Sequence, residues 1–275
     1  LVDATDDILI QGKISSGTTG EVVFNAKNLI LTPAQATGQQ VVYASGSGLR
    51  INAAERFDAT GYLRTDGGDI LVKARDISIQ NTGGQAAIAT YGSAQAEKTA
   101  TVQLDADTIL IKAEGVRDAG SGVTGPACAI EMAPVGEKFT SKVNINAGKS
   151  LTVIGDIRTN YFDGANSTQQ GESHLVIGSR ESNAAVTIVG DVYNGPTEHA
   201  QDTGLRSTVE INLAGRDSSL TGGIHDGSLE YGKPEGGVSL RLDDGAAWSA
   251  AKDSIVKEVR SSGGVIAVSS DKVRI

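Results

Sequence analysis

The sequence predicts an all-β protein built as a β-solenoid, in which three short strands per coil stack on their equivalents in the next coil. Three observations support this fold class. Apolar and polar residues alternate with a period of two along most of the chain. The same order of short strands returns about every 30 residues, a spacing typical of solenoid coils. Glycine is abundant, at 35 of 275 residues, and aromatic residues are only 4%, which suits a narrow aliphatic core with tight corners.

Composition and charge narrow the functions that need to be considered. The formal net charge is −9 and the isoelectric point is about 4.9. A chain this acidic repels phosphate groups and anionic lipid, so we expect no nucleic-acid partner and no membrane insertion by this chain. The single cysteine, Cys128, cannot form an internal disulfide, and its apolar surroundings in GPACAIEM indicate a core position.

In the first half of the chain, a coil is expected to open with a strand, a small residue, a polar pair and a second strand. Copies of this pattern occupy residues 23–31, 71–79, 103–111 and, one residue longer, 144–153. Third strands rich in small residues follow the first three copies, at 41–46, 86–92 and 127–133. Each coil thereby contains three strands whose inward side chains are buried only when coils stack.

The second half of the chain repeats the same order of strands, with a Gly-Asp element in the third strand segment of the coil. The segments 153–157 and 188–192 match as VIGDI and IVGDV, and 220–224 is a looser copy, LTGGI. We expect the glycines of these segments at coil corners, where the backbone needs a positive φ. The leading strands of these coils are expected to begin at residues 102, 143, 175, 209, 238 and 265.

The stretch 143–159, VNINAGKSLTVIGDIRT, contains about one whole coil. Its alternation predicts that Ile145, Leu151, Val153 and Ile157 point inward. Only residues 247–259 show a helix-like pattern, and their β-branched, Ser and Asp content disfavours a helix.

Four irregular segments are expected to be loops extruded from the corners of the coils. They are rich in Gly, Asp, Ser, Thr and Gln, and they span residues 53–68, 115–126, 160–173 and 195–207. Binding in solenoids commonly resides in such loops or along one face. Tyr161 and Phe162 are therefore the predicted ligand-contact residues.

The C-terminal end carries a family resemblance. VSLRLDDGAAW at 238–248 is followed by SIVKEV at 254–259 and GGVIAV at 263–268. This order resembles the late coils of classical autotransporter passengers from Gram-negative bacteria, with the only tryptophan, Trp248, at the place that the pattern gives it. The resemblance implies a right-handed parallel β-helix over residues 1–275 as a single passenger domain. Residues 236–270 would be the membrane-proximal coils, and the translocator barrel of type V secretion would lie outside this sequence.

The sequence contains no recognisable catalytic or metal-binding motif, so we predict no catalytic residue, no metal and no cofactor. His174, His199 and His225 lack the close spacing of zinc ligands. Paired carboxylates could serve a glycosidase, and the candidates are Asp6 with Asp7, Asp105 with Asp107, and Asp243 with Asp244. Neighbouring acids on a strand point to opposite faces, so Asp243 and Asp244 suit a turn, and Asp105 and Asp107 flank a corner. No column of Asp, Lys and Arg is expected at one register of adjacent coils.

The sequence therefore favours a non-catalytic cell-surface adhesin that mediates adhesion, autoaggregation or biofilm formation. Its expected partners are a host receptor, a matrix protein, a glycan or another bacterial cell, with self-association as a further mode. The resemblance implies the extracellular side of the outer membrane as its location. Two alternatives stay open: a polysaccharide lyase or hydrolase on the same fold, and a structural stalk that binds nothing.

Overall fold

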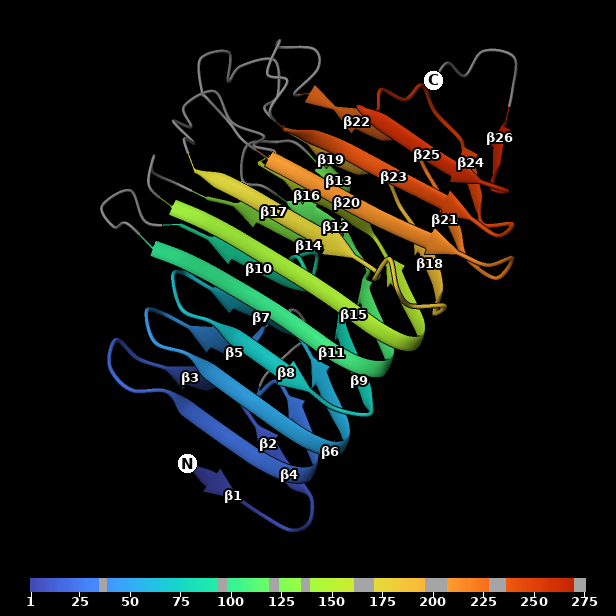
Figure 1. Cartoon of the computed structure of the whole chain (residues 1–275). Helices are drawn as coiled ribbons and strands as arrows, with labels where there is room; N and C mark the ends of the chain where they lie inside the picture. The colour runs from blue at the N-terminus through green and yellow to red at the C-terminus, as the bar shows by residue number, and fades with distance from the viewer. Residues whose placement is uncertain are drawn as a thin grey trace.

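The computed structural model describes residues 1–34, 39–92, 98–118, 124–134, 139–160, 171–195, 207–227 and 236–269. Every element bounded within these ranges is a β-strand. The strands pair in parallel, apart from one hairpin, and stack one above another from the N-terminus to the C-terminus (Figure 1). The all-β prediction is confirmed, and the parallel stacking is consistent with a β-solenoid.

The strands form three stacks, which we name the first, second and third faces. The first and second faces together form a 16-stranded sheet, and the third face is a separate sheet of eight strands. The first face contains β1 (Val2–Asp3), β4 (Val22–Thr32), β6 (Leu49–Thr60), β8 (Ile70–Lys73), β11 (Lys98–Ala113), β15 (Phe139–Ile154), β17 (Glu172–Ile177), β20 (Ser207–Ala214), β23 (Gly237–Asp243) and β25 (Glu258–Ser262).

The second face combines short strands with the C-terminal halves of the long strands β4, β6, β11 and β15. Its short strands are β2 (Ile8–Gln11), β9 (Asp76–Asn81), β18 (Ala185–Val189), β21 (Ser219–Thr221), β24 (Ala247–Ala250) and β26 (Val265–Val268). The third face contains β3 (Ile14–Ser16), β5 (Gln40–Ala44), β7 (Tyr62–Thr65), β10 (Ile88–Tyr91), β14 (Cys128–Ala133), β16 (Asp156–Thr159), β19 (Val192–Asn194) and β22 (Ile224–Asp226).

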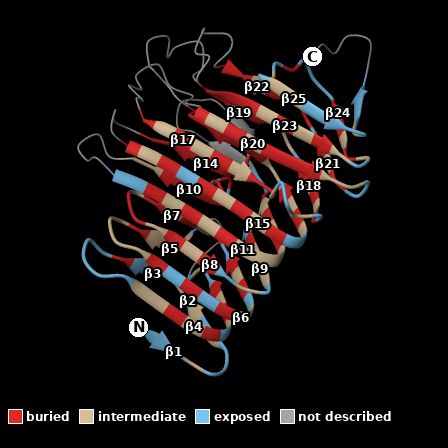
Figure 2. Ribbon diagram, viewed as in Figure 1, coloured by how far each residue is buried: buried red, intermediate tan, exposed pale blue. Residues whose placement is uncertain are grey.

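Inward side chains form continuous aliphatic columns along the stack, and Figure 2 shows the strands as buried bands that alternate mainly with bands of intermediate burial. One column on the third face contains Ile14, Val42, Leu63, Ile88, Ile130, Ile157, Val192 and Ile224. All eight are buried. Ile145, Leu151, Val153 and Ile157 are fully buried as well, so the inward assignment of the coil at 143–159 is confirmed.

The corner between the first and second faces explains the small residue in the sequence repeat. Ala26, Ala53 and Ala147 are buried there, where strands β4, β6 and β15 turn from one face to the next. The pairing register shifts just after this position, between Ala26 and Asn28 and between Ala106 and Thr108. A methyl group is the largest side chain that suits such a tight bend, because inward side chains from two faces converge on it.

The glycines of the Gly-Asp elements lie at corners before the third face, as predicted. Gly155, Gly190 and Gly222 have φ values of 118°, 150° and 150°. A Cβ atom at Gly190 would lie 2.3 Å from the carbonyl oxygen of Gly155, and one at Gly222 would lie 2.0 Å from that of Gly190. Backbone therefore stacks directly on backbone at this corner, and only glycine fits.

The prediction of an extruded loop at 53–68 is wrong. Strand β6 continues to Thr60, and β7 follows at Tyr62–Thr65 as the third-face strand of an additional coil. Phe57 is fully buried rather than part of a loop. Alanines at the inward positions concealed the alternation, because Ala53 and Ala59 carry little hydrophobic signal.

Two further expectations near the C-terminus are decided by the pairing. Val265 does not begin a leading strand: β26 pairs with β24 on the second face, whereas Val259 of β25 lies opposite Leu240 on the first face. The coil of β23 and β24 is short because its third face is reduced to a single bridge between Ile255 and His225. Residues 247–259 form β24 and the start of β25 rather than a helix.

The remaining predicted loops differ in how far they are described. Residues 115–126 include an antiparallel hairpin of β12 (Val116–Asp118) and β13 (Thr124–Pro126), which lies outside the parallel stacks as expected for an extrusion. Most of 160–173 and 195–207 lies outside the described residues, and so do Tyr161, Phe162 and His199.

Candidate functional site

One register of the third face carries a row of polar and aromatic side chains that point outward. From coil to coil the row contains Ser15, Tyr43, Arg64, Ala89, Glu131, Arg158, Tyr193 and His225. Its charged members are Arg64, Glu131 and Arg158, and the row holds neither Asp nor Lys at this register. The sequence concealed this row because segments of unequal length separate its members, so that neighbours in space are 21 to 42 positions apart.

The N-terminal patch of this row comprises Lys13, Tyr43, Arg64, Asp66 and Tyr91. Arg64 donates two hydrogen bonds to Asp66, from Nε to Oδ1 and from Nη2 to Oδ2, both 2.8 Å. The Tyr43 hydroxyl donates to Asp66 Oδ2 at 3.0 Å. Arg64 Cζ lies 4.5 Å from the ring centroid of Tyr91, and Lys13 Nζ lies 5.3 Å from that of Tyr43. Cations and aromatic rings thus alternate over four coils.

The side chains of the N-terminal patch are hydrogen-bonded to each other and remain partly exposed. The Arg64 side chain is 36% exposed and that of Asp66 is 23% exposed. The hydrogen bonds to Asp66 raise the pKa of Arg64, so its charge is permanent. Burial and the neighbouring Asp66 carboxylate raise the pKa of Tyr43, which keeps its hydroxyl a hydrogen-bond donor. The patch therefore offers fixed donors, acceptors and ring edges to a ligand in solution.

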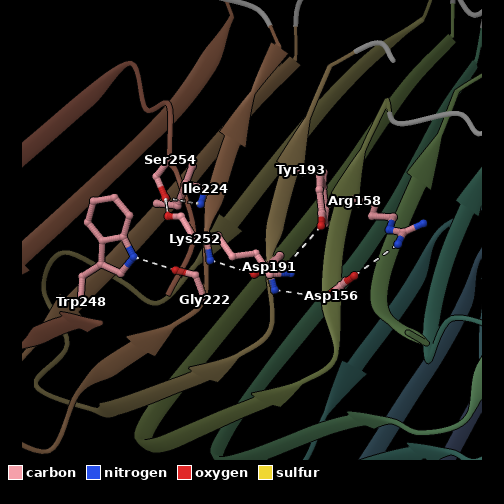
Figure 3. A network of polar contacts seen from close by, with 10 residues as sticks. Asp156, Arg158, Asp191, Tyr193, Gly222, Ile224, Trp248, Lys252 and Ser254 are labelled. Carbon is pink, nitrogen blue, oxygen red and sulfur yellow. Dashed lines mark hydrogen bonds and ion pairs between the residues drawn. The ribbon is translucent and has the colours of Figure 1, made fainter. Parts of the chain in front are cut away.

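The C-terminal patch comprises Asp156, Arg158, Asp191, Tyr193, His225 and Lys252. Its carboxylates bind backbone as well as side chains (Figure 3). Asp156 accepts the backbone N–H of Asp191 at 3.1 Å and Arg158 Nη2 at 3.2 Å. Asp191 accepts the Gly223 N–H at 2.8 Å, Lys252 Nζ at 2.6 Å and the Tyr193 hydroxyl at 3.1 Å. Each aspartate of a Gly-Asp corner therefore holds the next coil in place.

Burial and pairing shift the two aspartates of the C-terminal patch in opposite directions. Burial raises the pKa of Asp156, and the Asp191 N–H and Arg158 only partly counter it. Burial would raise the pKa of Asp191 too, but hydrogen bonds from Lys252 and the Gly223 N–H lower it overall. Burial and both carboxylates raise the pKa of Tyr193 well above its usual value. The side chains of Asp156 and Arg158 are only 5% and 7% exposed, so little of this pair faces solvent.

The tyrosine and histidine of the C-terminal patch stack on each other. The ring centroids of Tyr193 and His225 are 4.7 Å apart, with an angle of 13° between the ring planes. The Arg158 guanidinium, which lies on the preceding coil, is 5.3 Å from the ring centroid of Tyr193. The C-terminal patch therefore combines a cation–ring contact, like those of the N-terminal patch, with a stacked pair of rings.

Side chains from β24 and the segment after it, Trp248, Lys252 and Ser254, cover the C-terminal end of this patch (Figure 3). Trp248 is fully buried, and its Nε1–H donates to the Gly222 carbonyl at 3.0 Å. Ser254 Oγ accepts the Ile224 N–H at 3.1 Å. Lys252 reaches back to Asp191, because the third corner has Gly223 where an aspartate would stand. Residues 248–254 thus satisfy backbone groups that a further third-face strand would otherwise satisfy.

Two grooves follow the corner between the first and second faces. One has a volume of about 680 Å³ and is lined by residues that include Asn25, Lys27, Asn52, Lys73 and Arg75. The other, about 610 Å³, is lined by residues that include Asp105, Asn146 and Glu181. Asn52 donates to Asn25 at 2.8 Å and Asn146 to Asp105 at 3.0 Å, so part of the polar lining serves to hold neighbouring coils together.

The sequence-predicted carboxylate pairs form no shared site. Asp105 accepts hydrogen bonds from Gln103 and Asn146, and Asp107 pairs with Lys149 at 2.8 Å, as expected for corner residues. Asp244 has a φ of 53° and follows the end of β23, so the turn predicted for this pair is confirmed.

Histidine and cysteine are likewise dispersed. His174 Nδ1 lies 2.9 Å from Thr208 Oγ1. Cys128 is fully buried and packs with Ala86 and Ala89, so its core assignment is confirmed. Across the described ranges, no three His, Cys, Asp or Glu side chains gather as metal ligands would.

Comparison with protein-family models, with curated sequences and with solved structures finds no match for this chain. Within the part of the chain that the structure describes, no helix has both the length and the apolar content needed to span a bilayer.

Proposed function

We propose that this chain is a right-handed parallel β-helix of the autotransporter passenger class, and that it acts as a non-catalytic adhesin module on the surface of a Gram-negative bacterium. Three stacks of parallel strands, a narrow aliphatic core and the C-terminal coils around Trp248 support this proposal. Its partner would be a host receptor, a matrix protein, a glycan or another bacterial cell, reached after type V secretion.

The single observation that carries the binding function is the N-terminal patch. It presents Tyr43, Arg64 and Tyr91 on consecutive coils, with Asp66 fixing the Arg64 fork. Aromatic and arginine side chains dominate binding surfaces, because they combine contact area with directed hydrogen bonds. A network already ordered in the free protein loses little conformational entropy when a ligand binds. Glycans and protein surfaces both fit this chemistry.

Binding of the purified chain to cells, matrix proteins and a glycan panel tests the proposal. Arg64→Ala is expected to weaken binding at least tenfold, roughly the effect of removing one interface anchor. Arg50→Ala is the matched control, because Arg50 is 45% exposed and pairs with Glu21 on the first face. Equal binding by the two variants would exclude the N-terminal patch as the adhesive surface. Tyr161→Ala with Phe162→Ala tests the predicted contact loop in the same assay.

A second candidate function, the cleavage of polysaccharides by a hydrolase or a lyase, is favoured by one observation. Asp156 and Asp191 lie on adjacent coils and their pKa values shift in opposite directions, a combination found in acid and base pairs of active sites. Both carboxylates, however, accept backbone hydrogen bonds and are nearly buried. Turnover of acidic polysaccharides that Asp191→Asn abolishes would support this candidate, and a panel without any turnover would dismiss it.

A further inference from the structure

The two grooves along the corner between the first and second faces carry opposite charges. The groove of about 680 Å³, which we name the basic groove, has as its described charged lining residues Lys27, Lys73, Arg75 and Asp107. The groove of about 610 Å³, the acidic groove, has Asp105 and Glu181. Both follow the corner at which the long strands β4, β6, β11 and β15 bend from the first face to the second (Figure 1). A ligand at this corner therefore meets different charges in different coils.

Small side chains form the floor of the basic groove. Ala26 and Ala53 are only 7% and 5% exposed, and Ala74 on the next coil is half-buried. Asn25, Asn52 and Lys73 stand beside these alanines at one outward register of the first face. Because the alanines are short and their polar neighbours are long, the corner is hollowed along three consecutive coils.

The asparagines of the basic groove keep hydrogen-bonding capacity for a ligand. Asn52 Nδ2 donates to Asn25 Oδ1 at 2.8 Å. Among the described residues, this bond leaves Asn25 Nδ2 as a donor and Asn52 Oδ1 as an acceptor. A sugar hydroxyl both donates and accepts, so it matches this pair of groups.

The charged side chains of the basic groove differ in whether they are already paired. Arg75 pairs with Asp76 at 3.1 Å, and Asp107 pairs with Lys149 at 2.8 Å. Lys27 and Lys73 are exposed, and within the described ranges neither has an ion-pair partner. Their coils are two strand spacings apart, about 10 Å along the stack. The groove thus holds two separated ammonium groups that a ligand can neutralise.

Two cations along one groove fit a ligand whose negative charges recur along a chain. The net charge of −9 opposes such a ligand only weakly, because charges further away than about 8 Å are screened at physiological ionic strength. None of the described lining residues is aromatic, whereas single-stranded nucleic acids bind by stacking their bases on aromatic rings. Amides, ammonium groups and a shallow alanine floor favour an acidic sugar chain instead.

We infer that the basic groove binds an acidic oligosaccharide, with its anionic groups against Lys27 and Lys73 and its hydroxyls against Asn25 and Asn52. The groove volume lies within the usual range of ligand sites. The basic groove follows the corner between the first and second faces, whereas the N-terminal patch lies on the third face. This site therefore does not depend on the proposed adhesive surface, and the failure of one leaves the other measurable.

Calorimetric titration of the full chain with two kinds of acidic oligosaccharide tests the inference. Oligogalacturonate offers carboxylates and heparin-derived oligosaccharides offer sulfates, so the two arms distinguish the source of the anionic group. Binding of at least one is expected, and it should weaken as the salt concentration rises. A neutral oligosaccharide of equal length and a single-stranded oligonucleotide are the comparison ligands, and both should bind more weakly.

Variants of the two lysines locate the site. Lys27→Gln and Lys73→Gln should each weaken binding about fivefold, near the upper value for an exposed charge pair. The two positions are well separated, so the double variant should lose about twenty-fivefold. Lys142→Gln is the matched control, because Lys142 is an exposed lysine of β15 outside both grooves; it should bind like the wild type. Arg64→Ala should also bind like the wild type.

Thermal melting checks that each variant is folded, as expected for substitutions at exposed lysines. Absence of binding to both acidic oligosaccharides, equal binding by the wild type and the double variant, or tighter binding of the oligonucleotide would overturn the inference. Binding lost in Arg64→Ala but kept in the double variant would assign the sugar to the N-terminal patch and overturn it too. Self-association in sedimentation that the double variant abolishes, without any sugar binding, would assign the groove to a second copy of the chain instead.

Discussion

The N-terminal and C-terminal patches occupy one outward row of the third face, yet the carboxylates in the two patches bind different kinds of donor. In the N-terminal patch, the hydrogen bonds that Asp66 accepts from described residues come from the side chains of Tyr43 and Arg64. In the C-terminal patch, Asp156 and Asp191 each accept a backbone N–H of the following coil. The first arrangement leaves polar groups at the surface, and the second uses them to hold the stack.

The difference follows from whether an aspartate directly follows the corner glycine. Gly155-Asp156 and Gly190-Asp191 place a carboxylate directly after a glycine that contacts the neighbouring backbone. At Gly61-Tyr62, the corner before the strand that carries Arg64, a Cβ on the glycine would lie 2.4 Å from the Gln39 carbonyl oxygen, but no aspartate follows this glycine. A Cβ on Gly12, in the first coil, would meet no atom within 4 Å. An aspartate directly after a tight corner glycine holds the next coil, whereas Asp66 lies at the other end of β7 and binds side chains. Four predictions test this distinction.

The largest effect is expected for an added methyl group at the tight corner. Gly190→Ala should lower the free energy of unfolding by about 4 kcal/mol, because a positive φ and a Cβ 2.3 Å from the Gly155 oxygen are both incompatible with alanine. Gly12→Ala, with a φ of 140° and open space, should cost about 1 to 2 kcal/mol. Urea unfolding measures both. Equal losses would refute the contrast between the two corners.

The second-largest loss of stability is expected when the arginine is removed from a patch. Arg158→Ala leaves Asp156 buried without its guanidinium and should destabilise the protein by about 3 kcal/mol at neutral pH. The cost should shrink at acidic pH, since burial already favours the protonated Asp156. Arg64→Ala should cost under about 1 kcal/mol because its ion pair is partly exposed. A larger loss for Arg64→Ala than for Arg158→Ala would reverse the assigned roles.

Acid titration should separate the two aspartates of the C-terminal patch. The lowered pKa of Asp191 adds stability above its unfolded value near pH 4, and that stability is lost as pH falls toward the folded pKa. The raised pKa of Asp156 acts in the opposite sense: its contribution is full below that value and is lost as pH rises through the folded pKa. Asp191→Asn should therefore reduce the loss of stability that occurs as the pH falls. Asp156→Asn should reduce the loss of stability that occurs as the pH rises through the folded pKa of Asp156.

The unfolding free energy of each variant between about pH 3 and pH 6 measures these slopes. The two variants serve as controls for each other. Matching changes on the same side of the curve would contradict the opposite shifts.

The smallest effect is expected for removal of a tyrosine hydroxyl. Tyr193→Phe deletes the bond to Asp191 and should cost about 1 kcal/mol, the usual value of one buried hydrogen bond. Tyr43→Phe deletes the bond to Asp66 at a more exposed site and should cost less than about 0.5 kcal/mol. Thermal melting resolves the two. If Tyr43→Phe were the costlier change, the N-terminal patch would be the structural one.

The sequence could predict the coil but not the alignment of every coil. Alternation placed Ile145, Leu151 and Val153 inward because the two-residue period of a strand depends on local sequence alone. The coil containing β7 was missed, since alanines at Ala53 and Ala59 weakened the same signal. Val265 was assigned to the wrong face because the coil before it, which contains β23 and β24, is shorter than the others.

The candidate site was largely beyond sequence reasoning. Tyr43, Arg64 and Arg158 carry no motif, and a strand of two to four residues gives no hint of which outward residues will align. The repeated Gly-Asp element was recognised as a corner, but its bond from Asp156 to the next Asp191 N–H was not. The repeat itself was the available signal: an aspartate that returns with each tight corner has an acceptor role there.

The sequence alone determined that this protein is all-β, that its strands are short and repeat in coils, and which aliphatic side chains form the core. These properties depend on local periodicity and on glycine at corners, which neighbouring residues encode. Only the tertiary structure decided which coil lies on which, because segments of unequal length separate equivalent strands. That alignment creates the N-terminal patch, gives Asp156 and Asp191 their structural role and brings Lys27 and Lys73 to one groove.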